Sequence, residues 1–168
     1  MNDLRLNGAK VLGRVALVIS LSFMSIQVDA DEYAYKPSEK NTVQQLKHGE
    51  KWQTNEVLRK AMENIRIAVT ARQSDILKES LRASEYLILG QVVDKNIADI
   101  TKNCKLPTDS DRAFHAVVLN DMTEGARLMR TSNEIKVQRL GALGVLQTLR
   151  NYGRYFEHPN WRMDITKP

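Results

Sequence analysis

The spacing of apolar residues after residue 54 constrains the fold of this chain more than any other feature. Leu58, Met62, Ile65 and Val69 follow one another at intervals of four, three and four residues, and similar intervals recur to about residue 156. This period places apolar side chains along one side of a helix. No segment of this region alternates apolar and polar residues convincingly, and none contains an Asn-Gly or Asp-Gly hairpin turn. The sequence therefore predicts an all-α fold.

Four helices are predicted from this pattern. They run from Thr54 or Asn55 to about Arg72, from Ser74 and Asp75 to about Lys102, from Thr108 to the turn at Thr131, and from Ser132 and Asn133 to about Phe156. The segment from Thr108 to Asp111 resembles a capping box in which Asp replaces Glu, and Pro107 and Pro159 follow the second and fourth helices. Because the connections are short, we expect an antiparallel up-down-up-down four-helix bundle.

The buried faces of the later helices are predicted from the same spacing. They are Tyr86, Leu89, Val93, Ile97 and Ile100, continued by Cys104; Phe114, Val118, Asp121 or Met122, Gly125 and Met129; and Leu143, Leu146, Leu149, Gly153 and Phe156. Glycine inside a helix costs about 1 kcal/mol relative to alanine, and the predicted helices contain Gly90, Gly125, Gly141 and Gly144. We expect these glycines to mark close approach of helix backbones rather than space for a guest molecule.

The first thirty residues have the pattern of a cleaved secretory signal peptide. Arg5, Lys10 and Arg14 precede an uncharged apolar run at residues 15–26, and Val28 and Ala30 provide small or apolar residues before a cut. The run has twelve residues, whereas a membrane span needs about 20; an uncleaved N-terminal anchor is the alternative. The predicted divisions are a signal peptide at 1–30, a polar lead-in at 31–53, the bundle at 54–158 and a C-terminal tail at 159–168. The mature chain is predicted to be periplasmic or secreted, with no membrane span.

The charge of the chain does not indicate a nucleic-acid partner. The formal net charge is +5, and removal of the leader takes away three basic and two acidic residues, leaving +4. The basic residues are spread over all the predicted helices among acidic ones, as on a solvated surface. No Gly-x-Ser-x-Gly, His-Glu-x-x-His or phosphate-loop motif is present. We expect a protein that is not an enzyme and has no nucleic-acid partner.

The predicted topology gathers the chemically reactive residues at one end of the bundle. The start of the first helix, the end of the second, the start of the third and the end of the fourth share that end. Residues near it include His48, Trp52, Met62, Cys104, His115, Tyr152, Tyr155, His158 and Trp161. The single cysteine excludes an internal disulfide and the Cys-x-x-Cys-His attachment of covalent haem. If the protein has a small-molecule site, it is therefore expected at this end.

Met62, Cys104, His115 and His158 have side chains that ligate metals. Thioether, thiol and imidazole groups suit haem iron or copper. Each residue also has a structural alternative: Met62 as core packing, His115 as a hydrogen-bonded residue beside the core, and His158 as a cation at the negative end of the last helix. Cys104 is either a ligand, a small buried residue, or a thiol that pairs between chains in a homodimer. The aromatic residues either fill the end of the core or form a wall around a flat cofactor.

An exported four-helix bundle with these residues resembles the periplasmic b-type and c-prime cytochromes. In the b-type members a methionine early in the first helix and a histidine at the end of the fourth hold the haem iron. The resemblance implies that Met62, in the segment from Leu58 to Glu63, and His158 hold a non-covalent haem b, and that the protein transfers electrons to a periplasmic redox partner. The sequence thus predicts haem or copper bound by Met62, Cys104, His115 and His158, with an electron-transfer or metal-handling role. The alternative is a cofactor-free periplasmic interaction or stress-related bundle.

Overall fold

The computed structural model describes residues 50–163, and this part of the chain is all-α. Its elements are α1 (Glu56–Thr70), α2 (Gln73–Leu77), α3 (Ala83–Asn103), α4 (Thr108–Phe114), the π-helical turn η4 (His115–Leu119), α5 (Asn120–Thr131) and α6 (Ile135–Tyr155). The predicted signal peptide, His48, most of the lead-in and the last five residues lie outside the described part. Within residues 50–163, no helix combines the length and the apolar character that crossing a membrane requires.

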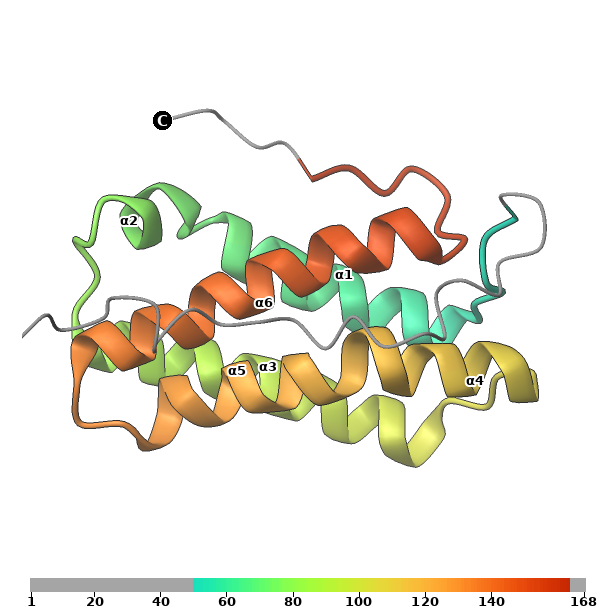
Figure 1. The fold of residues 1–168 in the computed structure, drawn as a ribbon, viewed down its shortest axis with the longest axis horizontal. Helices are drawn as coiled ribbons and strands as arrows, with labels where there is room; N and C mark the ends of the chain where they lie inside the picture. Colours follow the sequence, from blue (N-terminus) through green and yellow to red (C-terminus); the bar gives the residue numbers. More distant parts are fainter. Residues whose placement is uncertain (1–49, 164–168) are drawn as a thin grey trace, which may run out of the picture. The chain divides into compact units, whose positions relative to one another are not determined.

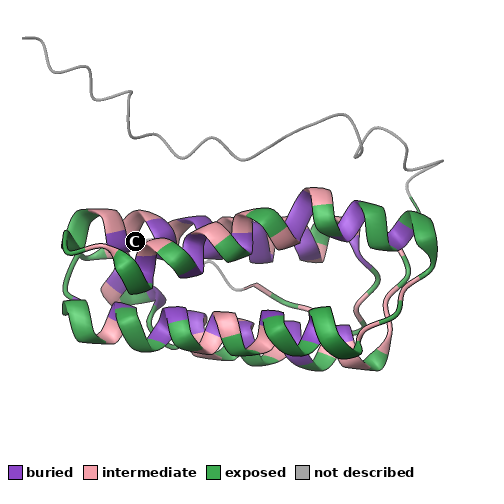
Figure 2. Cartoon of the chain, turned by 90° about the horizontal axis from the view of Figure 1, so that it is seen from below, coloured by how far each residue is buried: buried purple, intermediate pink, exposed green. Residues whose placement is uncertain are grey.

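The long helices pack along one another around a continuous core (Figure 1). α5 packs against both α3 and α6, and α1 packs against α3 and α6. α4, η4 and α5 follow one another without a break and form one long helical segment. Figure 2 shows the buried residues on the sides of the helices that face one another and the exposed residues on the outer sides. This is the burial pattern expected of amphipathic helices.

The predicted buried faces of the first three helices are confirmed, except that Cys104, predicted to continue the second face, is only half-buried. Every residue predicted to be buried in α1 and α3 is buried, and Phe114, Val118, Met122, Gly125 and Met129 are buried in the segment from α4 to α5. In α6 the buried face observed in the structure is rotated slightly about the helix axis from the predicted buried face. Leu143 is only half-buried, whereas Ala142, Val145 and Tyr152 are buried with Leu146 and Leu149. The wide apolar side of α6 contacts α5, α3 and α1, so it has no single narrow stripe.

The predicted continuous second helix is wrong, because the chain forms α2 and then starts again at α3. Glu79 has a φ of 59°, a left-handed conformation that ends a helix. Arg139 from α6 donates hydrogen bonds to the carbonyl oxygens of Ile76 and Leu77, at 2.9 and 3.3 Å, and its guanidinium lies 2.9 Å from the Glu79 carboxylate. At the start of α3, the Glu85 side chain accepts a hydrogen bond from the Arg82 backbone N–H at 3.1 Å. A contact from a distant helix thus stabilises the break.

The third helical segment starts as predicted, but its capping differs. It begins at Thr108, directly after Pro107, and no side chain caps its first turn. Asp109 and Asp111 lie in that turn, where the partial positive charge of the helix start favours carboxylates. The π-helical turn that begins at His115 was not predicted. Such turns occur frequently at functional sites.

Close backbone approach explains the paired glycines of α5 and α6. A Cβ at Gly141 would lie 2.5 Å from the carbonyl oxygen of Gly125, and a Cβ at Gly125 would lie 2.8 Å from the carbonyl oxygen of Gly141. Neither position can carry a larger side chain unless the helices move apart. The expectation of close approach is confirmed for this pair.

Candidate functional site

The start of α1, the end of α3, the start of α4 and the end of α6 are joined by contacts at one end of the helices. The Asn55 side-chain amide donates a hydrogen bond of 2.9 Å to the carbonyl oxygen of Lys105. The rings of Phe114 and Phe156 meet edge to face, with centroids 5.9 Å apart. These contacts place residues from distant parts of the sequence around a common end, which we call the reactive end.

A single β-bridge between Trp52 and Phe156 closes the reactive end on the side of α1 and α6. The Trp52 backbone N–H donates to the Tyr155 carbonyl oxygen, and the Glu157 N–H donates to the Trp52 carbonyl oxygen, both at 2.8 Å. The sequence gives no signal for this bridge, because one bridge needs no alternating pattern. It holds the residues before α1 beside the residues after α6.

Met62 belongs to the core of α1. It is fully buried, and its neighbours on the same face, Leu58 and Ile65, are fully buried as well. Most methionines in such positions fill irregular space between other apolar side chains. Its burial matches the packing alternative.

Cys104 is the C-cap residue of α3 and is half-buried. Its Sγ lies 3.4 Å from Oδ1 of Asn55, to which the thiol donates a weak hydrogen bond. The same Oδ1 accepts a hydrogen bond of 2.9 Å from the Leu58 N–H and caps α1. Burial is the main cause that raises the pKa of the Cys104 thiol, and the Asp111 carboxylate raises it further. The thiol is therefore protonated near neutral pH.

His115 and Cys104 line the same small pocket, although they come from different elements. The pocket has a volume of about 70 Å³ and is lined by Ile100, Thr101, Cys104, Leu106, Asp111, Phe114, His115 and Leu119. His115 is exposed, and its Nε2 lies 3.9 Å from the Asp111 carboxylate one turn earlier. The pocket thus combines a thiol, an imidazole and a carboxylate around apolar walls.

His158 lies in a different group, against the side of α6. The Tyr152 hydroxyl is 3.0 Å from Nδ1 of His158, and the ring centroids of His158 and Trp161 are 4.8 Å apart. Burial is the main cause that lowers the pKa of His158; Arg59 and Arg66 lower it and Glu63 raises it. The Tyr152 hydroxyl is buried and its pKa is raised, mainly by burial, so it stays protonated. It donates to Nδ1 of His158 in the neutral tautomer that carries its proton on Nε2.

Cys104 and His115 share the pocket, His158 pairs with Tyr152, and Met62 lies in the core. Burial is the main cause that raises the pKa of the Tyr152 hydroxyl, and Cys104 is close enough to Tyr152 to raise it further. Across residues 50–163 there is no set of three or more His, Cys, Asp or Glu side chains arranged to hold a metal ion. A metal bound here would need fewer protein ligands or added ones.

Haem binding by Met62 and His158 stays a prediction. Met62 is fully buried in the core, and Nδ1 of His158 lies 3.0 Å from the Tyr152 hydroxyl. Both side chains are thus engaged in packing or hydrogen bonding, and both would have to move to hold a haem iron.

Sequence reasoning missed three residues that organise the reactive end. Asn55 was predicted only as one of two possible start positions of the first helix, yet its side chain caps α1 and also contacts Cys104 and Lys105. Arg66 binds the segment after α6, and Gly153 lies beneath Trp161. Only the Asn55 cap has a local sequence signal.

Comparisons of the chain with protein-family models, curated proteins and solved structures found no match.

Proposed function

We propose that this protein is an exported, antiparallel up-down-up-down four-helix bundle that binds a transition-metal ion and has a metal-handling role. The contacts that join the ends of α3 and α6 to the starts of α1 and α4 support the bundle topology. Export rests on the signal-peptide pattern of residues 1–30.

The observation that carries the metal proposal is the shared pocket of Cys104 and His115. A thiolate and an imidazole from separate elements form a donor pair with which Cu(I) is compatible, since soft sulfur ligands select this ion. Cu(I) accepts two or three donors, so the pair needs no third protein ligand. We assign no ligand role to Met62 or His158, because both are engaged in packing or hydrogen bonding elsewhere.

Metal binding at this pocket requires loss of the Cys104 proton, because thiolate is the ligand. Burial raises the pKa of that thiol, so each bound ion releases one proton at neutral pH. The apparent Kd for Cu(I) is therefore expected to fall about tenfold for each unit increase in pH below the thiol pKa.

The test is an anaerobic competition for Cu(I) between the purified mature protein and a coloured Cu(I) chelator. We expect one Cu(I) per chain in the natural protein and loss of this binding in Cys104→Ser and His115→Ala. His158→Ala is the matched control, and it should keep the binding because His158 does not line the pocket. Equal Cu(I) binding by Cys104→Ser would contradict the proposed site.

A second candidate function is that of a cofactor-free interaction bundle. It is favoured by one observation: three of the four candidate ligands already have a structural partner. Met62 lies in the core, His158 is paired with Tyr152, and Cys104 is paired with Asn55. This alternative predicts that neither the natural protein nor any of the variants competes for Cu(I). The same titration thus separates the two candidates.

A further inference from the structure

The segment after α6 turns back over the helix it has just left. Its backbone passes through Pro159 and Asn160, and Asn160 has a φ of 61°, a left-handed conformation that asparagine tolerates better than most residues. The Trp161 N–H donates a hydrogen bond of 3.2 Å to the His158 carbonyl oxygen and closes this turn. Residues 158–162 thereby form a strap, as we call them below.

The strap packs against α6 at a defined position. The Trp161 indole lies so close to Gly153 that a Cβ at this position would overlap the ring. Its ring centroid is 4.8 Å from that of Tyr152 and 4.8 Å from that of His158. A glycine in the last turns of a helix, with an indole against it, indicates a position where the strap must approach closely.

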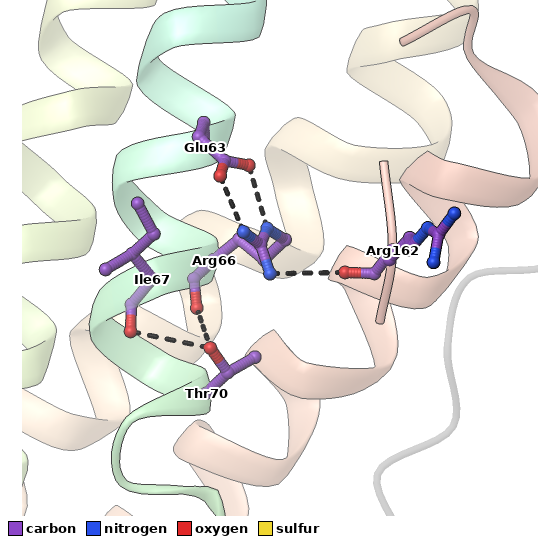
Figure 3. A network of polar contacts seen from close by, with 5 residues as sticks. All are labelled: Glu63, Arg66, Ile67, Thr70 and Arg162. Carbon is purple, nitrogen blue, oxygen red and sulfur yellow. Dashed lines mark hydrogen bonds and ion pairs between the residues drawn. The ribbon is translucent and has the colours of Figure 1, made fainter. Parts of the chain in front are cut away.

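On its other side, the strap is held by α1 (Figure 3). Nη1 of Arg66 donates a hydrogen bond of 3.2 Å to the Arg162 carbonyl oxygen. The Glu63 carboxylate holds the same guanidinium through contacts of 2.8 and 2.6 Å. The Arg66 guanidinium also lies 5.8 Å from the centre of a Trp161 ring, within the range of a cation–π contact.

The attachment of the strap is incomplete in one respect. The indole Nε1 of Trp161 is covered and has no hydrogen-bond partner within the described structure. In water this N–H would hydrogen-bond with solvent, so docking of the strap loses one hydrogen bond. The free-energy difference between the docked and the released strap therefore depends on a few contacts.

His158 makes this balance sensitive to protons. The charged and titratable groups that face it are Arg59, Glu63 and Arg66 on α1 and Tyr152 on α6. Burial of the ring lowers its pKa from the ordinary value of 6.5; Glu63 opposes this shift, while both arginines add to it. A released strap exposes His158 to water and restores its ordinary proton affinity, so the released state binds protons more tightly. Docking of the strap is therefore favoured above about pH 6.5 and becomes weaker as the pH falls below this value.

We propose that residues 158–162 are an acid-released strap, which uncovers the Tyr152–Gly153 side of α6 when His158 gains a proton. Neutral His158 hydrogen-bonds with the Tyr152 hydroxyl through Nδ1 and lies against Trp161 with the two rings tilted by 46°. Charged His158 would carry a partly buried charge near the guanidinium groups of Arg59 and Arg66, which Glu63 offsets only in part. The strap contains neither Cys104 nor His115, so its release is tested separately from metal binding at their pocket.

The test measures the exposure of Trp161 as a function of pH. The difference between the fluorescence of the natural chain and that of Trp161→Phe isolates the Trp161 signal from that of Trp52. We expect this signal to shift to longer wavelength and to become more accessible to acrylamide between about pH 8 and about pH 5, while the helical circular dichroism stays constant. His158→Gln should remove the pH response, and His115→Gln, the matched control, should keep it.

Gly153→Ala provides a variant in which the strap is displaced by volume instead of by charge. In this variant the Trp161 signal at about pH 8 should already resemble that of the natural chain in acid. An unchanged Trp161 signal across this pH range in the natural chain would overturn the proposal, as would an unchanged pH response in His158→Gln. Loss of helical signal in step with the Trp161 change would also overturn it, because release would then be unfolding of the whole chain.

Discussion

Substitution of Gly141 by alanine tests the packing that brings α5 and α6 together. The added Cβ would lie 2.5 Å from the carbonyl oxygen of Gly125, 2.9 Å from Cβ of Leu128 and 3.2 Å from the backbone nitrogen of Met129. Two of these three atoms belong to the backbone, so no side-chain rotation relieves the overlap. The helices must separate locally.

The expected magnitude follows from two opposing effects. Overpacking of a close contact costs about 2–3 kcal/mol, whereas alanine inside a helix is favoured over glycine by about 1 kcal/mol. The net loss in the free energy of unfolding is then about 1–2 kcal/mol. With m of about 2 kcal/mol per M urea, in the middle of the range for small proteins, the urea midpoint should fall by roughly 0.5–1 M.

The assay is equilibrium unfolding in urea, followed by circular dichroism of the helices. Thr123→Ala on α5 is the control, because Thr123 is exposed and its replacement should change the stability by less than about 0.5 kcal/mol. A Gly141→Ala chain that is more stable than the natural one would refute the close approach. The gain would then reflect helix propensity alone.

Two further predictions concern the residues around Cys104. Asn55→Ala removes the cap of α1 and the hydrogen bond to Lys105, and it should lower the free energy of unfolding by about 1–2 kcal/mol. Asn55→Asp retains the capping acceptor, so its free energy of unfolding should fall by less. Equal losses in the two variants would contradict the capping role. Because burial raises the pKa of the Cys104 thiol above its ordinary value of 9.0, alkylation by iodoacetamide at about pH 8 should be slower in the folded chain than in the chain unfolded by urea. The folded chain holds the thiol proton more tightly than the unfolded chain does, so the contribution of Cys104 to the free energy of unfolding declines as the pH rises through 9.0 and above. If the thiol reacted equally fast in the folded and unfolded chains, both the raised pKa and this pH dependence would be contradicted.

The sequence predicts the buried faces of α1 and α3 well, because their apolar residues repeat at helical spacing and each face contacts a continuous core. It does not predict the break before α3. Ile76 and Leu81 are both buried, so the apolar spacing carries through the break, and the contact that stabilises it comes from Arg139, more than sixty residues away. Local spacing contains no information about such a contact.

The candidate site was predicted in part for a similar reason. Helix order alone brings Cys104 and His115 to one end, and they line one pocket. Helix order does not show which side chains within that end face each other, so it grouped His158 and Met62 with them. The spacing of Gly153 placed it on the buried face of the last helix. Because glycine has no side chain, its type does not indicate which neighbour covers it. Its neighbour is Trp161 of the strap.

X-ray absorption at the copper edge, on the full mature chain loaded with one Cu(I), tests the central claim most directly. The pocket of Cys104 and His115 predicts one sulfur and one imidazole nitrogen bound to copper, with the sulfur signal lost in Cys104→Ser. Copper bound only by nitrogen and oxygen, or a sulfur signal that persists in Cys104→Ser, would contradict the claim that this pocket is the metal site.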